Sequence, residues 1–373
     1  MFARVLAVLV LLQAVAMVAP PQSWPWWMVH FAAIEGCLFG ALLGLLAIYV
    51  TEERWVTVAA TTGMVVCLLP GLLSIAPYIQ EDQRFSVWSW FTGGSVPVVA
   101  VERDVALGTT VSADIWRGHG EGPRPAVLVV HGGSWRSGDK GEVPHVSAYL
   151  ASAGFTVVDV RYRLAGEAPF PAAIEDVRCA LAAVVAGAER FGIDPERLAL
   201  LGRSAGGQIA LTAAYADDSI RSSCGGTTPP VRAVVSVYGV TDVAWAHDHP
   251  YVPDVVDGVA ATEFYLGGPP DSAGTRYRDA SPGHWIAGQP LPATLLIHGT
   301  GERCVRPENT TFLREQLRDA GARQRTVLIP MADHGFDVRR GGIGEQLARG
   351  VILDFLRAEL SAAGPRPSGP GTP

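Results

Sequence analysis

The chain has 373 residues, which is enough for one full-sized enzyme domain and an additional segment. Its hydrophobic fraction of 49% and mean hydropathy of +0.23 are high for a soluble protein and direct attention to membrane segments. The net charge of −7 and the pI near 5.7 provide no basic surface to neutralise nucleic-acid phosphates, which excludes nucleic acid as a partner. The five cysteines form no C-x-x-C pair and no Cys/His cluster, so no metal site is expected.

Three apolar stretches occupy residues 5–19, 28–50 and 55–79. A bilayer core about 30 Å thick needs roughly 20 apolar helical residues, so the second and third stretches are long enough and the first is short. The first stretch has the composition of a cleavable secretory signal, but two further apolar runs follow at once, which favours an uncleaved helix. The sequence therefore predicts three transmembrane helices over residues 1–79 and a multi-pass protein held in the lipid bilayer.

The second stretch contains polar residues and a regular series of glycines. His30 and Glu35 lie near one end of the stretch, where their side chains are expected to reach the membrane interface. Gly36, Gly40 and Gly44 recur every four residues and so share one helix face. Because such a smooth face lets another helix approach closely, we expect tight helix packing there.

The few charges around these stretches predict an orientation in the cell membrane. Arg4 precedes the first stretch and Arg54 lies between the second and third, whereas residues 20–27 carry no Lys or Arg. Tryptophans at positions 24, 26 and 27 in that loop are typical of a membrane interface. The positive-inside bias predicts a cytoplasmic N-terminus and an extracytoplasmic location for residues 98 onward.

From residue 98 onward, short runs rich in β-branched residues alternate with longer amphipathic segments. The expected strands cover residues 98–105, 111–116, 126–130, 156–160, 198–201, 231–237, 294–297 and 326–329; helices are expected over 172–191, 207–215, 308–320 and 344–360. The first two strands are expected to pair antiparallel. The others are nearly all apolar, which is typical of a parallel sheet buried on both faces. This pattern predicts an α/β fold with catalytic groups at the carboxyl ends of the strands.

The remaining segments do not follow this alternation. Residues 241–285 are rich in Pro, Asp and aromatic residues and are expected to form an insertion over the site. Residues 80–97 are expected to be a linker, which leaves 98–362 as the catalytic domain. Residues 363–373 are rich in Pro, Gly and Ser and are expected to be a disordered tail.

A nucleophile motif lies at residues 202–206, with the sequence Gly-Arg-Ser-Ala-Gly. It follows the expected strand 198–201 and opens an expected helix, which is the context in which G-x-S-x-G forms a sharp turn that exposes its serine. Ser204 is therefore the predicted nucleophile.

A glycine-containing loop follows the expected strand 126–130, with His-Gly-Gly-Ser-Trp at residues 131–135. Glycines leave backbone N–H groups free to approach a substrate carbonyl. The amides of Gly132 and Gly133, together with that of Ala205, are the predicted oxyanion hole. His131 is expected to orient this loop rather than to act as the base.

A serine nucleophile needs a histidine base and an acid that holds the histidine in the correct tautomer. His334 lies just past the last expected strand, in a loop that can reach the nucleophile, and is the predicted base. Glu302 lies at the tip of the loop 298–305, which follows the expected strand 294–297 and begins with His298. Glu302 is the predicted acid, and Asp242, which follows the expected strand 231–237, remains the competing choice.

With these residues assembled, residues 98–360 resemble the hormone-sensitive-lipase-like and feruloyl-esterase-like branches of the α/β-hydrolase superfamily. The matching motifs are H-G-G-S-W at 131–135, R-Y-R-L at 161–164, F-P-A-A-I-E-D-V at 170–177, G-R-S-A-G-G at 202–207, H-G-T-G-E-R-C-V at 298–305 and D-H-G-F at 333–336. The resemblance implies an α/β-hydrolase fold and a carboxylic-ester hydrolase that needs no cofactor. It also implies supporting rather than catalytic roles for Tyr162 and Asp176.

The chain departs from this family in two ways. The family usually has aspartate where this chain has Glu302, and its soluble N-terminal cap elements are replaced here by the predicted membrane helices. Because cap elements often shape the acyl pocket, the second departure leaves the substrate open.

The sequence thus predicts a membrane-anchored serine esterase that acts on a small acyl ester through Ser204, His334 and Glu302. One alternative is a serine peptidase on the same fold, although the Arg/Glu-lined pocket for an amine is not visible. Another is a silent membrane-anchored binding module, which the intact serine, histidine and oxyanion loop disfavour. In an oxidising compartment Cys224 and Cys304 could pair, but nothing in the sequence brings them together.

Overall fold

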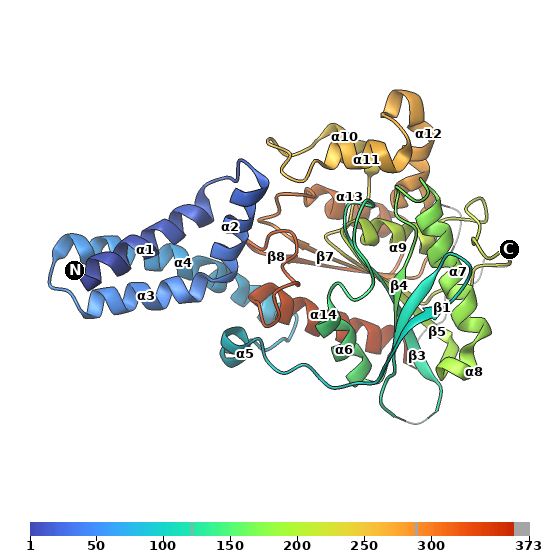
Figure 1. Cartoon of the computed structure of the whole chain (residues 1–373), viewed down its shortest axis with the longest axis horizontal. Helices are drawn as coiled ribbons and strands as arrows, with labels where there is room; N and C mark the ends of the chain where they lie inside the picture. Colours follow the sequence, from blue (N-terminus) through green and yellow to red (C-terminus); the bar gives the residue numbers. More distant parts are fainter. Residues whose placement is uncertain (121, 288–289, 362–373) are drawn as a thin grey trace.

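The computed structural model of the chain describes residues 1–120, 122–287 and 290–361, so the expected tail at 363–373 lies outside the described residues. Figure 1 shows two parts: an elongated helical bundle that contains the N-terminus, and a larger part in which helices surround a twisted sheet.

The larger part is built on one eight-stranded sheet with the order β1-β2-β4-β3-β5-β6-β7-β8. Its strands are β1 (Val101–Ala106), β2 (Ser112–Trp116), β3 (Arg124–Val130), β4 (Thr156–Arg161), β5 (Ile193–Arg203), β6 (Ala233–Val237), β7 (Ala293–Gly299) and β8 (Gln324–Ile329). The pairs β1–β2 and β2–β4 are antiparallel, and all other neighbours are parallel. The eight predicted strands and the α/β fold are confirmed.

Helices cover both faces of this sheet and bury its alternating side chains. They are α6 (Pro144–Ser152), α7 (Ala172–Ala186), α8 (Ala188–Phe191), α9 (Ala205–Tyr215), α13 (Glu308–Asp319) and α14 (Ile343–Glu359). Leu128 of β3 lies in the apolar cluster that includes α7, α9 and α13, whereas its neighbour Val127 lies in the cluster that includes α6 and α14. This alternation is why the central strands are almost entirely apolar.

The strand register brings the loops of the predicted site together. Val130, the last residue of β3, pairs with Gly202 of β5, so the loop after β3 begins beside the nucleophile motif. Residues 241–285 contain α10 (Val243–Asp248), α11 (Gly258–Leu266), α12 (Pro270–Ala280) and the 3₁₀ helix η1 (Pro282–Trp285). Figure 1 shows α10 to α12 grouped on one side of the sheet, next to the loops after its parallel strands.

The N-terminal part contains α1 (Phe2–Val18), α2 (Trp24–Glu35), α3 (Cys37–Tyr49) and α4 (Arg54–Gln80). By length and composition, α4 is the one helix of the described residues that can cross a membrane, and the α2–α3 pair is a second only if it counts as one span. The prediction of three transmembrane helices is therefore wrong. Helix α1 has only 17 residues, and α2 and α3 meet at an angle of 66°.

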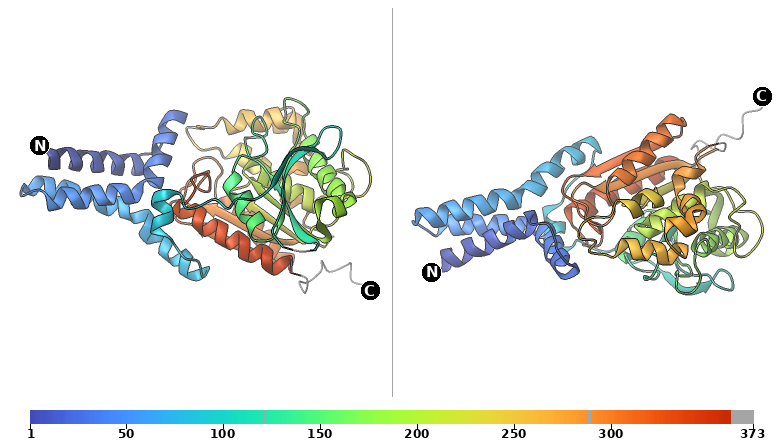
Figure 2. Two further views of the ribbon diagram at one scale, coloured as in Figure 1. Left: turned by 60° about the horizontal axis from the view of Figure 1, so that its bottom comes forward. Right: turned by 90° about the horizontal axis from the view of Figure 1, so that it is seen from above.

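The bend carries α2 out of the bundle. Figures 1 and 2 show α1, α3 and α4 running side by side, whereas α2 turns across their end and lies beside the larger part. His30 and Glu35 consequently do not reach outward to a membrane interface as expected. The Nδ1–H of His30 donates to the Ala16 carbonyl (2.8 Å), and the buried Glu35 carboxylate lies 3.7 Å from the Arg339 guanidinium.

Close packing at the glycine face is confirmed for two of the three glycines. A side-chain carbon added at Gly40 would lie 2.6 Å from Cys67 Sγ, and one added at Gly44 would lie 2.7 Å from Met64 Cβ. Helix α3 therefore approaches α4 to a distance that only glycine permits. Gly36 instead lies at the break between α2 and α3.

The expected linker at residues 80–97 is more ordered than predicted. It contains the short helix α5 (Val87–Thr92), in which the Trp90 ring is fully buried and lies 4.5 Å from the Phe39 ring. The Arg339 guanidinium donates to the Trp90 carbonyl at 2.7 Å. The segment thus joins the bundle to the larger part through fixed contacts.

One disulfide joins Cys179 of α7 to Cys224, and Cys37, Cys67 and Cys304 are free. Cys224 therefore does not pair with Cys304, a pairing that the sequence left open. The fold decides this pairing because it brings Cys224 back beside α7, with a Cα–Cα distance of 5.2 Å to Cys179.

Candidate active site

Ser204 occupies the turn between β5 and α9, with φ 53° and ψ −124°. A side-chain carbon added at Gly202 would lie 2.0 Å from the Gly206 carbonyl oxygen, and one added at Gly206 would lie 2.2 Å from the His131 carbonyl oxygen. Only glycine therefore fits on either side of the serine. The strained turn presents the Ser204 hydroxyl at the N-terminus of α9.

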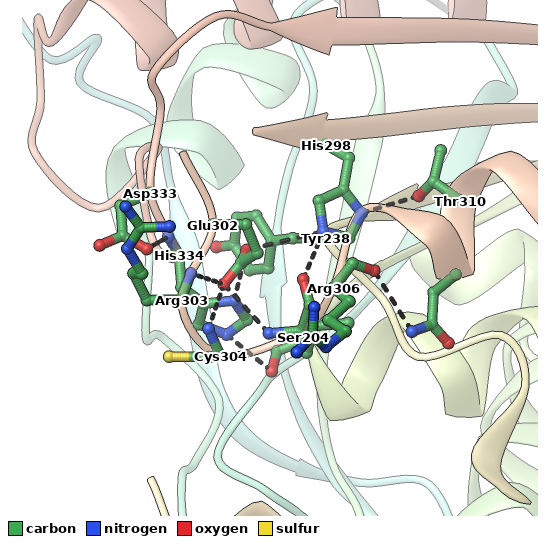
Figure 3. A network of polar contacts seen from close by, with 12 residues as sticks. Ser204, Tyr238, His298, Glu302, Arg303, Cys304, Arg306, Thr310, Asp333 and His334 are labelled. Carbon is green, nitrogen blue, oxygen red and sulfur yellow. Dashed lines mark hydrogen bonds and ion pairs between the residues drawn. The ribbon is translucent and has the colours of Figure 1, made fainter. Parts of the chain in front are cut away.

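His334 lies between Ser204 and Glu302, as Figure 3 shows. The Ser204 hydroxyl donates to His334 Nε2 over 2.9 Å, and the Nδ1–H of His334 donates to Glu302 Oε2 over 3.0 Å. Glu302 comes from the loop after β7 and His334 from the loop after β8. The structure thus brings together the three residues that were predicted from different parts of the chain.

The Glu302 carboxylate is completely buried and is held by several donors. Its Oε1 accepts the backbone N–H groups of Arg303, Cys304 and Val305 at 3.0, 2.7 and 3.1 Å. Burial by itself would raise the pKa of Glu302. The charge and hydrogen bond of His334 outweigh burial with the help of these donors, so the pKa is lowered and the carboxylate stays ionised.

The surroundings shift the pKa of His334 in the direction opposite to that of Glu302. Burial by itself would lower its pKa, but the Glu302 charge and hydrogen bond outweigh burial and raise the pKa above the ordinary histidine value. The adjacent Asp333 and Asp337 carboxyl groups add to this effect. The result is a histidine whose positive form is stabilised, as a base that accepts a serine proton requires.

His298 fixes the loop that presents Glu302. Its Nε2–H donates to the Val305 carbonyl (2.9 Å), and its Nδ1 is hydrogen-bonded to the Thr310 hydroxyl (2.7 Å). Its Nε2 also lies 3.6 Å from Glu302 Oε2. His298 therefore supports the acid, as expected from its place in the loop.

Asp242, the competing candidate for the catalytic acid, caps a helix. Its carboxylate accepts the backbone N–H of Trp245 at 2.9 Å and so caps the N-terminus of α10. Glu302 is the carboxylate that contacts the ring of His334.

Three side chains of types that bind metal ions also lie close together at the site. Ligand atoms of Glu302, Cys304 and His334 lie within 4.8 Å of one another. The proximity follows from the Glu302–His334 hydrogen bond, in which His334 Nδ1 carries its proton and Glu302 Oε1 accepts three N–H groups. The Glu302 and His334 atoms are therefore already hydrogen-bonded within the protein.

The loop at residues 131–135 lies against the nucleophile. A side-chain carbon added at Gly132 would lie 3.4 Å from Ser204 Cβ, but the N–H of Gly132 donates to Glu142 Oε2 at 2.9 Å. This amide, expected to bind a substrate oxygen, is thus engaged by a carboxylate. Gly133 follows with φ +106°, and Ala205 is the first residue of α9.

Buried side chains hold this loop in place, consistent with the supporting roles that the family resemblance implied. The His131 ring stacks on Tyr162 with centroids 4.3 Å apart, and the Tyr162 hydroxyl donates to the His131 carbonyl (3.0 Å). Asp176 is fully buried and accepts the backbone N–H and the side chain of Arg163 at 2.9 and 2.8 Å.

A cavity of about 680 Å³ opens above Ser204 and His334. Its walls come from the loop after β3, from the insertion and from α2. The α2 residues are Trp24, Trp27, Met28 and Phe31. Sequence reasoning missed this wall. The available signals were the tryptophan cluster at residues 24–27 and the glycine at position 36. The tryptophans were interpreted as a loop at the membrane interface, and Gly36 was interpreted as part of one continuous helix.

Helix α2 is also bonded to the segment that carries the histidine. The Trp27 indole N–H donates to Asp333 Oδ2 at 2.8 Å, and Asp333 Oδ1 accepts the backbone N–H of His334 at 2.7 Å. Burial, together with the nearby Glu302 charge, raises the pKa of Asp333 to about 7. Trp27 therefore contacts the site through a single intervening residue.

Known ester hydrolases are similar in sequence to this chain. Residues 114–317, more than half of the chain, match the BD-FAE family model. The probable carboxylic ester hydrolase LipM of Mycobacterium tuberculosis is 28% identical over 75% of this chain and 67% of its own length. Ethyl acetate hydrolase of Pseudomonas putida is 30% identical over 61% of this chain and 70% of its own length. The chain spans only 63% and 58% of the esterases LipC and LipQ of Mycobacterium tuberculosis.

Solved structures show the same fold. A bacterial heroin esterase superposes with a TM-score of 0.61 at 24% identity and covers 74% of this chain and 89% of its own. A thermophilic esterase from Thermogutta terrifontis superposes with a TM-score of 0.58 at 22% identity, over 73% of this chain and 98% of its own. The N-terminal helices lie outside residues 114–317, which match the family model.

Proposed function

Because this chain belongs to the BD-FAE family, we propose that it is a carboxylic-ester hydrolase that works through an acyl-enzyme on Ser204. The relatives LipM and ethyl acetate hydrolase are named as ester hydrolases, which supports the reaction class. The single observation that carries the proposal is the position of His334, hydrogen-bonded to Ser204 on one side and to Glu302 on the other.

In the acylation step, Ser204 Oγ attacks the ester carbonyl carbon while its proton passes to His334 Nε2. Glu302 accepts from Nδ1–H, which leaves Nε2 free to take the proton and stabilises the cation that forms. When the tetrahedral intermediate collapses, His334 returns the proton to the leaving alcohol. Water then attacks the acyl group with the help of the same histidine and regenerates Ser204.

The developing negative charge on the carbonyl oxygen needs backbone donors. The amides of Gly133 and Ala205 are the proposed donors, because Gly133 lies in the glycine loop and Ala205 directly follows the nucleophile. Gly132 was expected to contribute as well, but its N–H donates to Glu142. We assign Gly132 and Glu142 the role of holding the loop against Ser204.

Covalent labelling tests the proposal. A fluorophosphonate probe should label the full chain, and Ser204→Ala should abolish labelling and lower turnover of a short chromogenic ester by about 10⁶-fold. Ser219→Ala removes an exposed serine on the loop after α9 and should leave both signals intact. Labelling that persists in Ser204→Ala would contradict the assignment of the nucleophile.

We also propose that α4 crosses the cell membrane and that the hydrolase part lies outside the cytoplasm. Helices α1, α3 and α4 expose large apolar side chains, among them Leu12, Leu45 and Leu72. The charged residues Arg4 and Arg54 lie at the end of the bundle away from the sheet, where the positive-inside bias favours the cytoplasm. The Cys179–Cys224 disulfide is of the kind that persists outside the cytoplasm.

A further inference from the structure

The cavity above Ser204 has two walls of different chemistry. The wall formed by α2 is apolar and consists of Trp24, Trp27, Met28 and Phe31. The rest of the lining is mixed: it contains apolar side chains such as Val143, Val240 and Val256, and the charged side chains of Arg136, Glu142, Asp254, Asp257 and Arg306. A cavity of about 680 Å³ with one wholly apolar wall and charged groups elsewhere in its lining matches a ligand that itself has an apolar and a polar part.

The apolar wall is joined to the catalytic histidine through one residue, Asp333. Trp27 is 7% exposed, and its indole donates to Asp333, the residue before His334. Trp24 packs on Trp27 with ring centroids 4.8 Å apart and is itself 52% exposed. The wall thus extends from Trp27, which contacts Asp333 beside the catalytic histidine, to the exposed ring of Trp24.

Large apolar side chains are also exposed on α2 outside this wall and on the bundle. Met28 and Val29 on α2 are 45% and 47% exposed, and Leu42 on α3 and Leu69 on α4 are also exposed. Figures 1 and 2 show that α2 lies across the end of the bundle, between α1 and the hydrolase part. A bilayer that surrounds the bundle would therefore end at the level of α2.

Aromatic residues mark the same level. Trp24 on α2 and Trp88 and Phe91 on α5 are all exposed, and α2 and α5 project to opposite sides of the bundle at its junction with the hydrolase part (Figure 2). Tryptophan side chains concentrate at the boundary between lipid and water. Helices α2 and α5 are thus positioned to lie along the membrane surface, with the cavity mouth beside them.

We propose that α2 binds the apolar chain of an amphiphilic ester that enters the cavity directly from the bilayer. The inference rests on the proposed ester hydrolysis at Ser204 and on the proposed insertion of the bundle. The apolar chain lies along Trp27, Met28 and Phe31, the ester carbonyl reaches Ser204, and the polar part contacts the charged side chains in the rest of the lining. The bond that is cleaved and the path of the proton are those of the proposed hydrolysis.

The test uses the full chain in phosphatidylcholine vesicles and two chromogenic esters. p-Nitrophenyl butyrate is supplied in water, and p-nitrophenyl laurate is dissolved in the vesicles. Met28→Gln should lower the ratio of kcat/KM for laurate to that for butyrate about tenfold, because a polar amide replaces an apolar contact with the long chain. Val29→Gln is the matched control: it lies next in sequence, is equally exposed and does not line the cavity, so the ratio should not change.

A second measurement identifies the source of the ester. At constant bulk laurate, adding empty phosphatidylcholine dilutes the ester in the vesicle surface. Hydrolysis should fall in proportion to the mole fraction of laurate in the surface. A rate that follows only the bulk concentration would show entry from water and overturn the bilayer route.

The outcomes separate this inference from the proposed function. If Met28→Gln lowers kcat/KM for both esters equally, or if Val29→Gln lowers the laurate-to-butyrate ratio as much as Met28→Gln does, α2 does not bind the apolar chain. The inference then fails, while the proposed ester hydrolysis stands. If the wild type neither hydrolyses butyrate nor reacts with a fluorophosphonate, the proposed function itself fails. Complete fluorophosphonate labelling of each variant shows that its active site is folded.

Discussion

The two carboxylate oxygens of Glu302 accept hydrogen bonds from different groups. Glu302 Oε1 accepts three backbone N–H groups of its own loop, and Oε2 accepts the Nδ1–H of His334. The longer side chain therefore both closes the loop after β7 and orients the histidine. Because the carboxylate is fully buried, its effect on His334 is not weakened by solvent.

Replacing this carboxylate should damage catalysis far more than the fold. In Glu302→Gln, the amide oxygen can keep the three backbone donors, which turns the NH₂ group toward His334 Nδ1 and favours the wrong tautomer. We expect kcat to fall by about 10³- to 10⁴-fold, measured with a short chromogenic ester, with fluorophosphonate labelling slowed but detectable.

Asp242→Asn is the matched control, because asparagine also caps a helix well and α10 should keep its N-cap. Its activity should stay within a few-fold of the wild type. If Asp242→Asn were the more damaging change, Glu302 would not be the catalytic acid.

The same pair of residues predicts a pH dependence. The free enzyme needs neutral His334, so kcat/KM should rise as the pH increases through the pKa of His334. Glu302 raises this pKa against the effect of burial, which places the midpoint above the ordinary histidine value. In Glu302→Gln burial remains and the charge is lost, so the midpoint should move to lower pH. A pH profile of the residual activity checks this, and an unchanged midpoint would contradict it.

The break at Gly36 gives α2 and α3 different functions. Helix α3 stays in the bundle and presents Gly40 and Gly44 to α4, whereas α2 leaves the bundle to contact the hydrolase part. His30 and Glu35, which a continuous membrane helix would expose to lipid, instead lie near Asp333 and Arg339. The bend at Gly36 thus brings the polar side chains of His30 and Glu35 next to polar groups of the hydrolase part.

Close packing of α3 on α4 predicts a strong effect of a larger residue at Gly44. In Gly44→Leu the new side chain would overlap Met64 and the Ala60 carbonyl oxygen, so the bundle should lose about 1–3 kcal/mol of stability. Thermal unfolding of the detergent-solubilised chain would measure the change. Leu45→Phe adds bulk at a neighbouring position that is 56% exposed and should have little effect. Equal unfolding temperatures for the two variants would contradict the packing.

The two parts of the molecule are joined by polar contacts as well as by the chain. Trp27 bonds to Asp333, Tyr78 donates to the Ile343 carbonyl, and Arg339 donates to the Trp90 carbonyl. Because α2, α4 and α5 all take part, the active-site cavity has a fixed orientation relative to the bundle. Membrane insertion of the bundle would therefore also orient the cavity.

Reporter fusions test this orientation. A reporter that is active only in the cytoplasm should be silent when fused after Pro373, because the proposed crossing by α4 places the hydrolase part outside. A fusion after Glu53, in the loop at the far end of the bundle, should be active and serves as the control. A bright signal from the fusion after Pro373 would reverse the proposed topology.

The sequence alone determined the strands, the α/β fold and the candidate residues of the reaction. Strands buried on both faces need continuous apolar runs, and a strand-to-helix turn as tight as the one around Ser204 needs glycines, so both leave a local pattern. Ser204, His334 and Glu302 were predicted for the same reason: each follows a recognisable strand. Their distances from one another depend on the order of the strands in the sheet and on the register between neighbouring strands.

Only the tertiary structure decided what depends on contacts between distant segments. Hydropathy is the same for a helix that spans a membrane and for one that packs on a protein, so the hydropathy of residues 28–50 did not indicate that α2 turns away at Gly36 to form a cavity wall. The partners of Trp27, Gly132 and Cys224 lie 306, 10 and 45 residues away, and none of these pairs leaves a local pattern. Hydrogen bonds and disulfides form between groups that the fold brings together, and spacing along the chain does not determine which groups meet.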